Sequence, residues 1–287
     1  MVDPLAVIYN EGYWRVCNVS PMYRCHFSEI NIKRYSSKIR QDLASDAGIS
    51  SGSLLQVSIE NLPLLKYSHE DPNGLQITVT TCHKNRFQTT NKEVYVAILL
   101  GWGHGLPLSN QFITFLPYML ERGEKRVGET VKNSLQLMFD CNITPFCFTQ
   151  VDLLRFLFEI LENDTSKSTD SLSLGYKLSP QVNFSDKGTL TFDIGDIRTI
   201  WNRVKEYYDK HEQLFYAYNH IKTQINHAFQ LDVTVLPLRE IALPKAEVKS
   251  TGVVKMKTPE IINAVFTVLN KIYVVDWLQH ELLLNNL

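Results

Sequence analysis

The chain begins with MVDPLAVIYNEGYWRVCNVSPMYRCHFSEINIKRYS (residues 1–36), the stretch that decides how its fold starts. The run that begins at Trp14 predicts a strand, and Ser20-Pro21 predicts a turn into a second short strand. A helix is expected next, because Ser28 is a favourable N-cap and Glu29 places a negative charge in the first turn. No residue of this stretch belongs to a catalytic motif.

The residues that follow predict a sheet with helices. The first helix is expected to end near Asp46. Three β-rich runs separated by turn signals predict an antiparallel meander. These runs are Leu54–Glu60, Leu75–Cys82 and Val94–Leu100. Apolar residues at helical spacing then predict helices at Gly128–Phe139 and Thr149–Leu161. Residues 1–162 are therefore expected to form one sheet-and-helix domain.

A second sheet-and-helix domain is expected over residues 171–287. The Ser-, Thr- and Asp-rich segment Asn163–Ser171 marks the expected boundary. The elements predicted after it are strands at Leu172–Leu178 and Gly188–Ile194, helices at Asp196–Tyr208 and Glu212–Phe229, and two or three strands between Gln230 and Lys257. The fold class is thus α+β, with two antiparallel sheet-and-helix units and a long apolar C-terminal helix packed on a sheet.

The last helix is unusually apolar. Thr258 as N-cap and Pro259 at the first helical position predict its start, and it is expected to reach about Leu284. Apolar residues occupy more than the single stripe that a surface helix needs. Two interpretations stay open: burial between the layers of its own unit, or exposure as a surface for a partner.

Composition limits the possible functions. The chain has 287 residues, of which 44% are hydrophobic and 21% charged, as expected for a globular protein. Its formal charge is -1, from 29 Lys and Arg against 30 Asp and Glu. A protein that binds nucleic acid on its own usually carries a basic excess. Any DNA contact is therefore expected to come from a local patch or from a partner.

Other sites receive little support from the sequence. The five cysteines are widely spaced and form no C-x-x-C pair, which argues against a disulfide framework and a zinc site. No apolar run approaches the roughly 20 residues that a membrane span requires. We expect a soluble intracellular protein that binds no membrane, metal or cofactor.

Gly48–Gly52 fits the G-x-S-x-G pattern of a hydrolase nucleophile, which requires a strand before it and a helix after it. Here a helix is predicted before it and a strand after it. No catalytic residue is therefore expected. The alternative hypothesis is an intracellular enzyme of unknown reaction with a cleft between the two α/β units.

Short motifs along the whole chain resemble those of the centromere protein L family, subunits of the constitutive centromere-associated network of the inner kinetochore. Each motif is weak alone, but their order and spacing agree with the family. The motifs are Asp3-Pro4, Ser20–Arg24, Thr114–Pro117, Phe139–Cys141, Leu190–Ile194, Ile200–Val204 and the turn at Gly252.

The resemblance implies a non-enzymatic scaffold of the nucleus, located at the centromere and kinetochore and required for chromosome segregation. It implies a heterodimer with centromere protein N, contacts with other inner kinetochore subunits, and binding of centromeric nucleosomes and DNA through the complex. In this family the heterodimer encloses DNA in a basic groove, and alignment favours Lys92 and Arg239 as groove residues. Lys125, Arg126 and Lys132, which cluster around the start of a predicted helix, are the second choice.

The surface for the partner is expected in the C-terminal unit. Short strands with exposed edges and an apolar helix face suit a sheet that continues across two chains. The candidate contacts are Val233, Val235, Val253, Val254, Val274, Trp277 and Leu278. In the absence of the partner, the same surface is expected to pair two copies into a homodimer.

Overall fold

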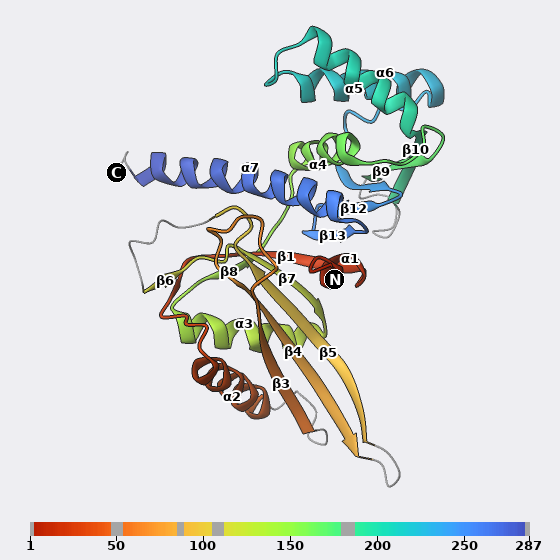
Figure 1. Cartoon of the computed structure of the whole chain (residues 1–287). Coiled ribbons are helices and arrows are strands. Elements are labelled where there is room, and N and C mark those ends of the chain that lie inside the picture. The colour runs from red at the N-terminus through yellow and green to blue at the C-terminus, as the bar shows by residue number, and fades with distance from the viewer. Residues whose placement is uncertain (1–2, 47–53, 85–88, 105–111, 179–186, 285–287) are drawn as a thin grey trace. The chain divides into compact units, whose positions relative to one another are not determined.

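The structure, a computed structural model, describes residues 3–46, 54–84, 89–104, 112–178 and 187–284. The chain forms two compact units. The first consists of residues 1–4 and 14–146, and the second of residues 5–13 and 147–287. Each combines an antiparallel sheet with helices, which confirms the predicted α+β class (Figure 1). The Gly48–Gly52 stretch lies outside the described residues.

The sheet of the first unit contains the predicted meander. In spatial order its strands are β1 (Tyr13–Val19), β7 (Tyr118–Gly123), β5 (Thr89–Leu100), β4 (Gly74–Lys84) and β3 (Leu54–Leu62). All neighbours are antiparallel. Three shorter strands complete the unit: β8 (Ile143–Pro145) pairs with β1, and β2 (Met22–Tyr23) pairs with β6 (Ile113–Thr114).

Strand β7, which joins the meander to β1, has no recognisable strand pattern in the sequence. Its residues Tyr118, Met119 and Leu120 are all fully buried. A strand buried on both faces loses the alternation of apolar and polar residues on which a strand is recognised.

Two helices cover one face of this sheet. They are α2 (Glu29–Ser45), which Ser28 caps as predicted, and α3 (Lys125–Phe139). The helices lie side by side: Tyr35 packs edge-on against Phe139 at 4.8 Å, and Asp42 accepts a 2.7 Å hydrogen bond from Ser134. Apolar residues from both helices and from alternate positions of the strands form the core between them.

A buried ionic network lies between α3 and the sheet. Glu121 of β7, 4% exposed, accepts hydrogen bonds from Lys132 of α3 at 3.2 Å and from the Tyr95 hydroxyl at 2.8 Å. Burial lowers the pKa of Lys132, but the charge of Glu121 and the hydrogen bonds to Glu129 and Glu121 help to outweigh this effect, so the pKa is raised overall. Lys132 therefore stays charged, and its charge is compensated inside the unit.

The second unit contains five antiparallel strands. Its strands, in spatial order, are β10 (Lys187–Asp193), β9 (Ser171–Lys177), β11 (Leu238–Leu243), β12 (Ala246–Lys249) and β13 (Val253–Met256). Its helices are α1 (Ala6–Tyr9), α4 (Gln150–Asn163), α5 (Ile194–Tyr207), α6 (Gln213–Phe229) and α7 (Pro259–Leu284). Helix α7 packs against α4, α1 and β13.

The units divide at Phe146–Cys147, earlier along the chain than the boundary expected at Asn163–Ser171. Helix α4 belongs to the second unit because it packs against α7 and β11, and Lys271 pairs with Glu159 at 2.7 Å. The polar segment after α4 is ordered by Arg198, whose guanidinium donates a 2.8 Å hydrogen bond to the Ser166 carbonyl. A Ser- and Asp-rich composition therefore marks an internal turn here and not a linker.

We predict that Glu121→Ala destabilises the first unit by about 3–5 kcal/mol, because it leaves the Lys132 charge buried without its main partner. Urea unfolding followed by circular dichroism measures the effect. Glu129→Ala is the matched control: it removes the other acidic partner of Lys132, which is half exposed, and should cost under about 1 kcal/mol. Equal losses for the two variants would contradict a buried origin of the effect.

Candidate nucleic-acid and partner interfaces

Lys92 lies on β5, exposed to solvent, opposite Thr81 of β4. The carboxylate of the neighbouring Glu93 accepts a 2.7 Å hydrogen bond from Arg122 and does not pair with Lys92. Within the described residues, the Lys92 ammonium has no acidic partner. Its charge is therefore available to an outside anion.

A β-bulge brings the start of α3 next to this position. The register between β4 and β5 shifts after Val79, which leaves Val94 as the extra residue. The Val94 carbonyl accepts a 2.9 Å hydrogen bond from the Glu124 amide. Gly123 makes this approach possible: it has a φ of +110°, and a Cβ there would lie 2.2 Å from the Val94 oxygen.

The bulge places two exposed lysines on either side of one contact. Lys92 is two residues from Val94, and Lys125 is the residue after Glu124. Lys125 also has no side-chain partner in the described part of the chain. Arg126 differs, because it donates a 2.6 Å hydrogen bond to Asp46; this bond and the Asp46 charge raise the pKa of Arg126.

Lys132, named with these residues from the sequence, does not belong to this surface. It is 8% exposed and bound to Glu121 and Glu129. Basic residues that cluster in sequence need not share one surface, because helical periodicity turns Lys132 towards the sheet. The prediction that Lys132 contacts DNA is therefore wrong.

Arg239 lies in the second unit, on β11, and is exposed. The register between β11 and β9 shifts between Leu238 and Glu240, so Arg239 is itself the extra residue of a bulge. Its carbonyl accepts a 2.8 Å hydrogen bond from the Ser250 amide, which anchors the backbone while the side chain stays unpaired among the described residues. Bulges redirect side chains at functional edges of sheets, a feature with no signal in this sequence.

The candidate partner residues fall into three groups. Val233 and Val254 are at most 1% exposed and belong to the core of the second unit, so they cannot contact a partner. Val253 is half-buried, and Val235 is 78% exposed. Val274, Trp277 and Leu278 are in α7, but their side chains lie outside the described residues.

The strand edges also differ from the expectation. Strands β11 and β12 are each paired on both sides within the second unit, so their edges are not open. In the part of the chain that the structure describes, β10 pairs with β9 alone. The first half of α7 is buried: Ile262, Val265 and Leu269 have no exposed area. Of the two interpretations of this helix, burial within its own unit therefore applies to the first half.

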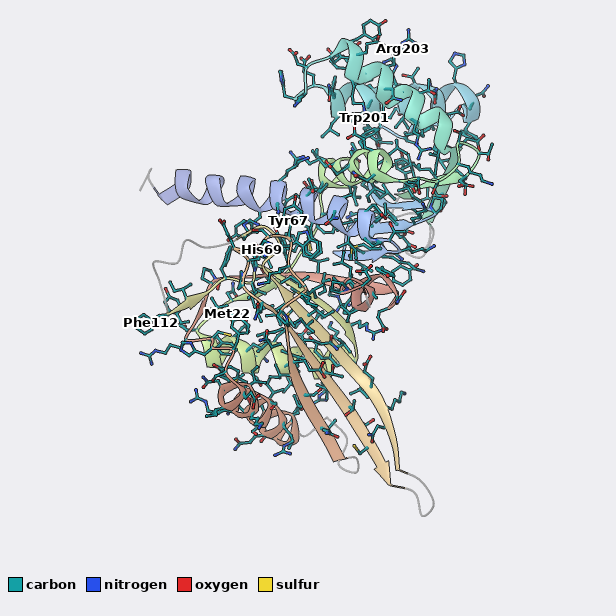
Figure 2. All side chains as sticks on the ribbon, viewed as in Figure 1. Met22, Tyr67, His69, Phe112, Trp201 and Arg203 are labelled. Carbon is teal, nitrogen blue, oxygen red and sulfur yellow. The ribbon has the colours of Figure 1, made fainter. Side chains whose placement is uncertain are left out.

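A shallow cleft of about 270 Å³ lies between α5 and α6. Arg203 of α5 and His220 of α6 line it, whereas Trp201 projects from α5 towards α4 and stacks on Phe158 at 4.2 Å (Figure 2). None of the candidate residues for DNA or partner binding lines this cleft. Among the described residues no cluster of His, Cys, Asp or Glu is suited to a metal ion, and none of the described helices is long and apolar enough to cross a membrane.

Comparison with known proteins gives one result. A family model described as Centromere protein L matches residues 8–279, which includes both units and all the candidate residues above. A search of curated proteins finds no match.

Proposed function

The chain belongs to the centromere protein L family of kinetochore proteins, which act in the nucleus at the centromere, and we propose that it pairs with centromere protein N to bind centromeric DNA. The family is a structural component of the kinetochore and not a known family of enzymes. We accordingly propose a non-enzymatic scaffold that also meets other inner kinetochore subunits and supports chromosome segregation.

The DNA part of the proposal is carried by Lys92, Lys125 and Arg239. All three are exposed, and none has a side-chain partner among the described residues. Two of them are held by bulged strands, so their backbones are ordered before any ligand arrives. Binding to phosphates releases counterions, and each such cation contributes substantially at low salt. Phosphate contacts position DNA without reading its bases, which suits a scaffold.

The low net charge of this chain explains why DNA binding would need a partner protein. With a formal charge of -1, the chain does not attract DNA over long range. Three cations divided between two units neutralise few phosphates. A second protein that supplies the rest of a basic groove would raise the number of contacts, and with it the affinity.

The partner surface is best supported at β10. This strand ends its sheet, and its residues Thr189 and Thr191 are exposed. An unpaired edge offers a row of amides and carbonyls to a strand of another chain. Val235, exposed after α6, is the apolar side chain that we add to this interface, and Val274, Trp277 and Leu278 stay candidates from the sequence.

We predict that changing Lys92 and Arg239 together to Glu weakens DNA binding by the heterodimer and leaves heterodimer formation intact. Fluorescence anisotropy over a salt series should show a slope of log affinity against log salt that falls by roughly one unit per lost contact. Lys167→Glu with Lys210→Glu is the control, because it changes the charge equally at two exposed lysines. If the two double variants behave alike, these positions do not contact DNA.

A second prediction concerns the β10 edge. Replacing Thr189 and Thr191 by Lys places charges on the edge and should prevent co-purification with centromere protein N, because lysines on an edge strand oppose strand pairing. In the isolated chain, light scattering should show that the same variant is a monomer while the unchanged chain is a dimer. Thr78→Lys with Thr80→Lys on β4, a strand paired on both sides, serves as control. Normal co-purification of the β10 variant would place the interface elsewhere.

A further inference from the structure

The first unit also presents a strand edge, at β3. This strand is the last in its sheet and, in the part of the chain that the structure describes, pairs with β4 alone. Natural proteins protect such edges with lysine, proline or bulges. Over Leu54–Leu62, β3 has neither lysine nor proline, its pairing with β4 is regular, and Glu60 is its single charged residue. The strand is therefore suited to accept another one.

The side chains of β3 favour a further strand as well. Leu55, Val57 and Ile59 point to the helix-covered face, where they pack against the core and are only partly buried. Gln56 and Ser58 point to the other face and are exposed. A strand added beside β3 would bury the apolar row on one face and meet polar groups on the other.

Helix α2 supplies positive charge beside this edge. It contacts α3 on one side and β3 on the other, whereas α3 contacts the inner strands β5 and β7. The carboxylate of Asp42 faces α3, where it accepts the Ser134 hydrogen bond. Lys33 is nine residues earlier, roughly half a turn away around the helix, and Arg40 is on the same flank as Lys33. Both basic side chains therefore lie on the flank that continues past β3.

Lys33 and Arg40 are exposed and have no side-chain partner among the described residues. The acidic residue of the same flank is Glu29, at the first turn of the helix. The other charges of α2 point elsewhere: Lys38 pairs with Asp42 at 2.8 Å, and Arg34 lies over the Tyr35 ring at 5.9 Å. The flank therefore carries two available positive charges along the edge.

We propose that the β3 edge and the Lys33–Arg40 flank form a docking site for an extended acidic segment of another protein. The segment adds a strand to β3 and directs carboxylates to Lys33 and Arg40. The spacing of the two basic residues matches that of carboxylates on a strand. Lys33 and Arg40 are about 10 Å apart along the helix, and residues four apart in a strand are about 13 Å apart. Flexible side chains can bridge the difference.

An acidic segment fits better than a second copy of the chain. Two copies joined at β3 by a two-fold axis would bring two α2 flanks together, each with its positive charges. Like charges across an interface oppose association. This site is separate from β10 and does not depend on the partner proposed above.

The test uses the full chain and a labelled peptide, Thr-Val-Thr-Glu-Thr-Val-Thr-Glu-Thr, which places Val and Glu on one face of a strand. Fluorescence anisotropy at low salt should show binding, and a peptide with Lys in place of Glu should bind at least about tenfold more weakly. Hydrogen exchange should show that the amides of β3 become protected when the acidic peptide binds. Arg40→Glu combined with Lys33→Glu should reduce the affinity about tenfold or more.

Arg34→Glu is compared with Arg40→Glu as the matched control, since both change an exposed arginine of the same helix and only Arg40 faces the edge. The proposal is overturned if the two single variants lose equal affinity, if both peptides bind alike, or if β3 gains no protection. It is also overturned if β3 is already protected in a dimer of the chain alone, because the occupant is then a second copy.

Discussion

The hydrogen bond from the Glu124 amide to the Val94 carbonyl joins the start of α3 to β5 in the first unit. It requires the bulge at Val94 and the absence of a side chain at Gly123. Because it fixes where α3 begins, it also determines which face each residue of α3 presents. Lys125 is left in solvent near Lys92, while Lys132 is turned under the sheet to Glu121. One backbone contact thus separates an exposed lysine from a lysine whose charge is compensated inside the unit.

A second constraint is that an open sheet always ends in strands with unpaired backbone groups. β10 in the second unit and β3 in the first are such strands among the described residues. Their surroundings differ, because β10 itself carries exposed threonines and β3 lies beside the basic flank of α2. A scaffold that assembles several proteins benefits from edges of different chemistry, because each then accepts a different partner.

Much of the fold can be predicted from the sequence where local signals are strong. The Ser28 cap, the meander and the start of α7 at Pro259 follow from capping, turn and periodicity rules. Strand β7 and the division of the units at Phe146–Cys147 do not, because they depend on packing between distant segments. For the sites, Lys92 and Arg239 are exposed and stay predictions, whereas the burial of Lys132, Val233 and Val254 depends on tertiary contacts that the sequence does not reveal. Bulges such as that at Arg239 have no sequence signal.

We propose that DNA binding belongs to the heterodimer and not to this chain alone. The most direct measurement compares the DNA affinity of the isolated chain, isolated centromere protein N and their complex, with one DNA duplex and the same salt concentrations. The account predicts that the complex binds much more tightly than this chain, with a steeper dependence on salt, because more phosphates are contacted. If the isolated chain binds DNA as tightly as the complex, with the same salt dependence, the claim of a shared groove is contradicted.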